Sequence, residues 1–181
     1  MTDENQKTEE KKHTRATKSG SVAIMEPLLV IGKVLIATAF NGGYVAFVSD
    51  LDVCTDGTGD DHGDDYHQNE TAYYNGGEFL DADEDQYLVI PPQIRSDVPP
   101  VVMGCQGRVT NLKTGKWWPA VTGEIGPDDK TGEAAICLAK KLNPRVSANS
   151  GDSNRIYLYE LWPGIPAVVD GKKYKLEPAG G

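Results

Sequence analysis

The 181-residue chain lacks the sequence motifs of several common enzyme classes. It has no GxSxG elbow, no P-loop and no dinucleotide fingerprint, so nothing in it indicates a serine esterase, an NTPase or a Rossmann enzyme. Its three cysteines, Cys54, Cys105 and Cys137, are odd in number and far apart. No CxxC pair supports a zinc site. A disulfide framework is not indicated, although the count still allows one bridge.

Long apolar runs are also missing. Residues 22–40 are apolar, but an acid, a proline and a lysine interrupt them, so the run is too short to span a bilayer. The polar residues 1–20 have mixed charge and no apolar periodicity, and we expect a disordered tail there. Neither segment resembles a signal peptide, which leaves the compartment unpredicted. With 39% hydrophobic and 25% charged residues, residues 21–181 are expected to form one globular domain.

Lys and Arg are absent from the whole stretch 50–85, which contains 13 Asp and Glu side chains. The chain as a whole has a net charge of −9. A negative field of this kind repels nucleic acid and anionic membranes, and it attracts a polycation. The alternative is a solvated acidic surface that serves only solubility. We expect neither a nucleic-acid partner nor a membrane partner.

The same acidic stretch contains a weak match to a calcium-binding loop. Residues 52–57 supply Asp, Cys, Asp and Gly at the loop positions 1, 3, 5 and 6. However, Cys54 is a poor ligand for a hard cation, and position 12 is Gly63 rather than Glu. His62 and His67 stand alone among the acids and are expected at the surface. We therefore predict no metal site and no cofactor.

Alternating apolar residues and turn signals predict a mainly β protein. A hairpin turn is expected at residues 41–43, and residues 50–78 are expected to be mostly loop. One amphipathic helix is predicted where Ala135, Leu138, Ala139 and Leu142 recur at helical spacing, ending at Asn143-Pro144. The pattern favours a small barrel or a strongly curved sheet with one prominent helix. The expected strands are 27–31, 33–40, 44–48, 87–90, 101–103, 107–111, 117–123 and 156–161, with a terminal hairpin of 167–169 and 173–176.

Two carboxylates nine residues apart give the strongest chemical signal in the chain. Glu124 ends an apolar, strand-like run, a Gly-Pro turn follows, and Glu133 begins the helix-like run. Two facing carboxylates are the minimum equipment for cleaving a glycosidic bond by general acid and general base. A plain solvated turn is the alternative.

The surroundings of the two glutamates predict different roles for them. Apolar neighbours are expected to raise the pKa of Glu124, which suits a proton donor. A position in the first turn of a helix would favour the ionised form of Glu133, which suits a base. The reverse assignment stays open, because the end of a strand is often solvated.

Other residues are candidates for binding a substrate. Asp50, Asp52 and Asp56 are predicted to pair with substrate ammonium groups. Tyr73 and Trp118 are candidates for stacking on sugar rings, although aromatic side chains also serve as core residues.

Three stretches of the chain resemble the fungal-type chitosanases of glycoside hydrolase family 75 and their bacterial and phage relatives. The likeness covers roughly residues 35–176 and leaves out the tail. The first stretch is DLDVCTDG at 50–57, continuing through QNETA at 68–72 to LDA at 80–82, and the second is YLVIP at 87–91. The third and most specific is AVTGEIGP at 120–127 followed by TGEAAICLAK at 131–140.

This resemblance implies endo-hydrolysis of β-1,4-linked glucosamine polymers such as chitosan, with inversion at the anomeric carbon. It also implies that Glu124 and Glu133 are the catalytic carboxylates and that the protein is secreted or phage-associated. One departure is that Glu124 stands where most members of the family have Asp, and the extra methylene moves the carboxyl group by about 1 Å. We expect a monomer. The open alternatives are a non-catalytic binding or virion-associated module of the same fold, and a hydrolase of a related cell-wall polysaccharide.

Overall fold

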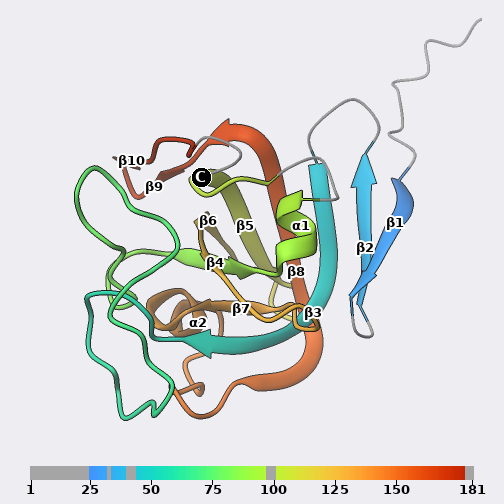
Figure 1. Cartoon of the computed structure of the whole chain (residues 1–181). Coiled ribbons are helices and arrows are strands. Elements are labelled where there is room, and N and C mark those ends of the chain that lie inside the picture. Colours follow the sequence, from blue (N-terminus) through green and yellow to red (C-terminus); the bar gives the residue numbers. More distant parts are fainter. Residues whose placement is uncertain (1–24, 32–33, 40–43, 97–100, 178–181) are drawn as a thin grey trace, which may run out of the picture.

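The fold is a mainly β domain built around a closed barrel of six strands. The computed structural model describes residues 25–31, 34–39, 44–96 and 101–177, without the side chains of residues 25–39 (Figure 1). Going round the barrel, each strand is hydrogen-bonded to the next, and the last returns to the first. The order is β3 (Tyr44–Cys54), β7 (Glu133–Ala135), β4 (Tyr87–Ile90), β6 (Trp117–Ile125), β5 (Cys105–Asn111) and β8 (Asp152–Pro166).

The barrel interior is filled by alternate side chains of the long strands. Phe47 of β3 stacks on Tyr159 of β8 with ring centroids 5.1 Å apart, and both are buried. A Cβ atom at Gly107 would lie 2.8 Å from Leu88 Cδ1 and 3.4 Å from a methyl of Leu161. Leu88, Gly107 and Leu161 therefore point into the barrel, and their neighbour Val89 points outward, because side chains alternate along a strand.

The remaining elements extend the sheet or pack against the barrel strands (Figure 1). The strands β1 (Met25–Ile31) and β2 (Val34–Ala39) extend the sheet beyond β3. The helix α2 (Ile136–Leu142) contacts β3, β5, β6 and β7, and a short helix, α1 (Pro92–Ser96), follows β4. The hairpin of β9 (Val168–Val169) and β10 (Lys172–Lys173) turns at Asp170-Gly171, where both residues have positive φ. No helix in the described residues has the length and apolar content to cross a membrane.

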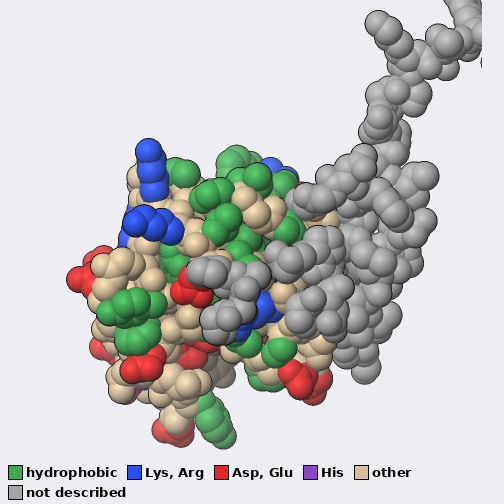
Figure 2. All heavy atoms as spheres, turned by 45° about the horizontal axis from the view of Figure 1, so that its top comes forward, with side chains coloured by type: hydrophobic (Ala, Val, Ile, Leu, Met, Phe, Trp, Pro, Cys, Tyr) green, Lys and Arg blue, Asp and Glu red, His purple; other side chains and the backbone are tan. Residues whose placement is uncertain are grey.

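The acidic stretch forms a long loop between β3 and β4, and this loop covers one side of the barrel. Many acidic side chains lie over the left and lower part of the face in Figure 2, the side where Figure 1 places this loop. The buried Tyr87 fastens the start of the loop, since its hydroxyl donates a hydrogen bond to the carbonyl of Asp56 at 2.7 Å. The loop is therefore held against the barrel rather than free of it.

The prediction of a small β barrel with a helix near residues 135–142 is confirmed, as is the hairpin at Asp170-Gly171. Two local predictions are wrong. Residues 101–103 form no strand, and residues 50–54 belong to β3 rather than to a loop, because they pair with β7 and β8. The predicted tail 1–20 and the turn at 41–43 lie outside the described residues. All three cysteines are free.

Candidate active site

Glu124 and Glu133 are brought together by their pairing with one residue of β4. Val89 is the Cα partner of Glu124 on one side and of Glu133 on the other. Adjacent strands lie about 4.8 Å apart, so the two Cα atoms are separated by about 9–10 Å. Asp52 of β3 is in turn the partner of Glu133, which extends the row to four strands. Partners in register project from the same face of a sheet, here the outer face of the barrel.

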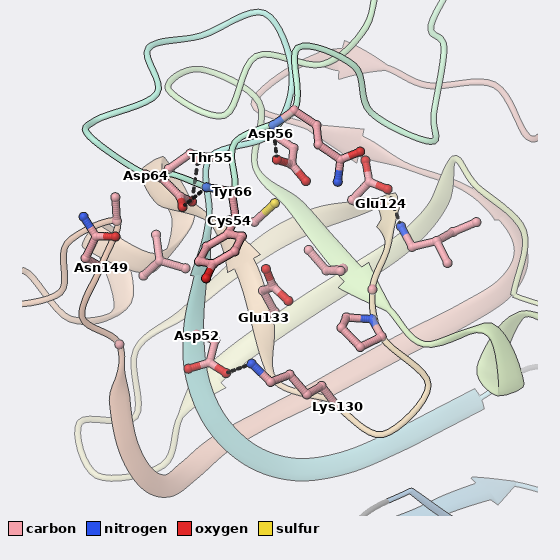
Figure 3. Close-up of a pocket in the computed structure, with 18 of the residues that line it drawn as sticks. Asp52, Cys54, Thr55, Asp56, Asp64, Tyr66, Glu124, Lys130, Glu133 and Asn149 are labelled. Atoms are coloured by element: carbon pink, nitrogen blue, oxygen red, sulfur yellow. Dashed lines mark hydrogen bonds and ion pairs between the residues drawn. The ribbon is translucent and has the colours of Figure 1, made fainter.

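A cavity of about 470 Å³ opens on this row of residues. A cavity of this volume lies within the range of small-molecule and cofactor sites. Figure 3 shows the two glutamates reaching it from the strands on either side of β4, with the acidic loop above them and the turn that carries Lys130 below. The charged side chains of its lining are five carboxylates and one lysine: Asp52, Asp56, Asp64, Glu124, Glu133 and Lys130.

Glu133 is a half-buried side chain whose carboxyl group has no hydrogen-bonding partner among the described residues. Its pKa is raised to about 7, mainly by burial and also by the nearby charges of Asp52, Asp56 and Glu124, while Lys130 opposes the rise. No hydrogen bond to another described residue contributes to this shift. The group is therefore protonated at mildly acidic pH, as a proton donor must be.

Glu124 is also buried, with 9% of its surface exposed, but its two oxygens are occupied. Its Oε2 accepts a hydrogen bond of 2.7 Å from the backbone N–H of Ala72, and its Oε1 accepts one of 2.7 Å from that of Ile125. The pKa of Glu124 is raised overall, mainly by burial, and these two hydrogen bonds reduce the rise. The ionised form is thereby favoured at Glu124 over Glu133, as a base requires.

The surroundings of the two glutamates agree with the prediction at Glu124 and differ from it at Glu133. The pKa of Glu124 is raised by burial, as predicted, but the pKa of Glu133 is raised rather than kept low. The expectation for Glu133 is wrong because it lies in β7, and α2 begins three residues later at Ile136. Gly132, with φ of 98°, lets β7 approach β3 closely, since a Cβ atom there would lie 2.7 Å from Ser49 Oγ.

Asp52 and Lys130 form the only ion pair between charged groups of the cavity lining in the described residues. Their charged atoms are 3.9 Å apart, and both side chains are well exposed. Burial and the neighbouring Asp50 raise the pKa of Asp52, and Lys130 lowers it. One lysine does not neutralise five carboxylates, so the cavity favours a cationic ligand.

The structure brings four of the predicted site residues to the cavity, namely Glu124, Glu133, Asp52 and Asp56, and places three elsewhere. Asp50 does not line the cavity, and its carboxylate accepts a hydrogen bond from Ser49.

The two aromatic candidates also lie away from the cavity. Tyr73 is 1% exposed and donates a hydrogen bond to the carbonyl of Lys175, so it is a core residue. Trp118 lies outside the cavity and packs beside Lys141, whose ammonium is 5.1 Å from the ring centroid. The stacking roles predicted for Tyr73 and Trp118 are therefore wrong for this cavity.

Among the charged and aromatic residues of the cavity lining, three were not predicted as site residues: Asp64, Tyr66 and Lys130. Asp64 and Tyr66 are far from both glutamates in sequence and reach the cavity through the fold of the long loop. Lys130 could have been predicted from the sequence, because it stands on the turn that joins the two glutamates.

Within the described ranges, no group of three or more His, Cys, Asp or Glu side chains is arranged to hold a metal ion. Asp52 and Cys54 of the calcium-like segment lie on β3 rather than in a loop. No protein-family model matches this chain, and a search of curated proteins finds no match either.

Proposed function

We propose that this protein is an inverting glycoside hydrolase that cleaves a glucosamine-containing, chitosan-like polysaccharide. The observation that carries the proposal is the pair of glutamates flanking Val89 in one cavity. Glu124 is anchored by backbone N–H groups, and Glu133 is half-buried with no hydrogen-bonding partner among the described residues. Their Cα separation of about 9–10 Å allows the carboxyl separation of about 6.5–9.5 Å that inverting enzymes need.

In the proposed reaction Glu133 transfers its proton to the glycosidic oxygen as the bond from that oxygen to the anomeric carbon breaks. Glu124 takes a proton from a water molecule, whose oxygen bonds to the anomeric carbon from the opposite face. The products are two shorter chains, and the configuration at the new reducing end is inverted. Water supplies both the hydroxyl group and the proton, so no co-reactant is needed.

The charge of the cavity supports an amine-bearing substrate. Asp52 and Asp56 line the cavity beside the two glutamates and can bind ammonium groups of neighbouring sugar units. The sequence resemblance to family 75 chitosanases supports the same substrate class. An N-acetylated polymer lacks these charges, so we expect it to be a poor substrate.

The test is incubation of the protein with chitosan oligomers and, separately, with chitin oligomers. Shorter glucosamine oligomers should be detected by mass spectrometry, and NMR should show that the first-formed product has the inverted anomeric configuration. Cleavage of chitin oligomers alone would contradict the proposed substrate. Added salt should weaken chitosan binding, because screening acts on the charge pairs.

A binding module without catalysis is the second candidate. It is favoured by Glu124, which stands where most members of the resembled family have Asp and whose two oxygens are both engaged by backbone N–H groups. Binding of chitosan oligomers with no product after prolonged incubation would establish this candidate instead of the hydrolase.

A further inference from the structure

Tyr66 lines the cavity, and its side chain makes no hydrogen bond or ring contact with the other described residues. It lines the cavity together with Glu133 and Asp52, yet 88% of its surface is exposed, more than for any other large hydrophobic side chain in the described residues (Figure 3). Isolated exposed aromatic residues are common on protein surfaces, so exposure alone carries no conclusion.

The other tyrosines of the described chain each have a partner. The hydroxyl groups of six of them form hydrogen bonds, and Tyr74 packs against Phe79 with ring centroids 5.0 Å apart. In the described part of the molecule, Tyr66 has neither a ring contact nor a hydrogen bond to its hydroxyl. Its ring faces and hydroxyl are therefore available to a ligand.

The backbone that carries Tyr66 is nevertheless firmly held. Asp64 accepts a hydrogen bond of 2.9 Å from the N–H of Tyr66 and one of 3.0 Å from the hydroxyl of Thr55, close to the end of β3. On the other side, the amide of Asn149 donates a hydrogen bond of 3.0 Å to the carbonyl of Gly63. The loop is thus fastened to both walls of the cavity, and Tyr66 is presented from a fixed position.

We infer that Tyr66 is the sugar-stacking residue of a binding subsite beside Glu133, and that its ligand is a hexosamine ring of the polysaccharide. This inference rests on the proposed function. An aromatic ring offers a flat apolar face to the C–H groups of a pyranose, and tyrosine loses little conformational entropy because it has only two side-chain torsions. The hydroxyl group remains free to bind a sugar oxygen.

Two kinds of contact would recognise the amino sugar: charge pairing with its ammonium group and stacking on its ring. Asp52 and Asp56 supply attraction that salt screens, whereas contact with the Tyr66 ring does not depend on charge. The two contributions are therefore separable by ionic strength.

The experiment measures binding of glucosamine oligomers by calorimetry in the E133Q background, where cleavage is suppressed. Y66A should weaken binding roughly 3- to 10-fold, by a similar factor at low and at high salt. Y74A is the matched control, because Tyr74 is 53% exposed but lies outside the cavity, and it should bind like the parent. Y66W should retain binding, and its emission should shift to shorter wavelength when the oligomer covers the new indole.

Unchanged affinity in Y66A, or an emission of Y66W that oligomers leave unaltered, would overturn the assignment of Tyr66 while leaving the hydrolase proposal intact. A parent protein that binds no oligomer at all would overturn the proposed function, and the ligand of Tyr66 with it.

Discussion

Two regions of the barrel hold carboxylates that are withdrawn from solvent, and their pKa values are shifted in opposite directions. On the β5–β8 side, Glu160 is 5% exposed and receives hydrogen bonds of 2.6 and 2.8 Å from Arg108 and one of 2.5 Å from Tyr44. Burial acts to raise the pKa of Glu160, but these hydrogen bonds and the charge of Arg108 outweigh it and lower the pKa. On the β7–β4 side, Glu133 has no such partner, and its pKa rises to about 7.

This difference distinguishes a carboxylate that is paired within the fold from one that is a candidate for catalysis. A buried charge that serves only stability is normally paired, because an unpaired one is costly. A group whose pKa is moved toward neutrality by burial and like charges, and which faces a cavity, is a functional-site candidate. Glu133 meets this description and Glu160 does not.

The largest expected effect is on catalysis by E133Q. Loss of the proton donor should lower the rate of chitosan cleavage by about 10²- to 10⁴-fold, because Gln has no transferable proton. The check is the rate at which reducing ends appear. E160Q, on the structural side of the barrel, should keep its rate at temperatures where it stays folded. An E133Q variant as active as the wild type would remove Glu133 from the mechanism.

E124D should lower the rate by about 10²-fold, because a carboxyl displaced by about 1 Å no longer matches the position of the attacking water. The shorter side chain also loses reach to the N–H of Ala72, 2.7 Å from the Glu124 carboxylate. Steady-state kinetics should show the loss mainly in kcat. If E124D were faster than the wild type, the shorter carboxylate would be the better base in this cavity.

The pH dependence of stability should differ between the two regions. The pKa of Glu133 is raised from 4.5 to about 7, so below pH 4.5 the group is protonated in both states. As pH rises from 4.5 to 7, the unfolded chain loses the proton first, and stability of about 3 kcal/mol at most is lost. E133Q should therefore gain stability relative to the wild type across this range, measured by urea unfolding at several pH values. A difference that stays constant with pH would contradict the raised pKa.

R108M should destabilise the fold by about 1–3 kcal/mol, because it leaves the buried Glu160 without its strongest hydrogen bonds. Thermal or urea unfolding measures this loss. The double variant with E160Q should recover part of it, since no buried charge remains. The rate of chitosan cleavage at low temperature should not change, and a large loss of activity in R108M would mean that the two regions are coupled.

Local sequence patterns predicted the strands and the helix whose residues by themselves favour the conformation that they adopt in the fold. The alternation at 107–111 and 117–123 marks β5 and β6, and the helical spacing of Leu138 and Leu142 marks α2. The strand β7 could not be predicted in this way. Its residues Glu-Ala-Ala have low β propensity, and pairing with β3 and β4 imposes the strand on them.

The sequence by itself determined the barrel class, the acidic side of the molecule and the identity of the two central carboxylates, because these follow from composition and from patterns within about ten residues. The tertiary structure alone decided which carboxylate holds a proton and which aromatic ring faces the cavity. Both depend on burial and on contacts between distant segments. The N–H of Ala72 reaches Glu124, Asp52 approaches Glu133, and Asp64 fixes Tyr66 only once the chain has closed into the barrel.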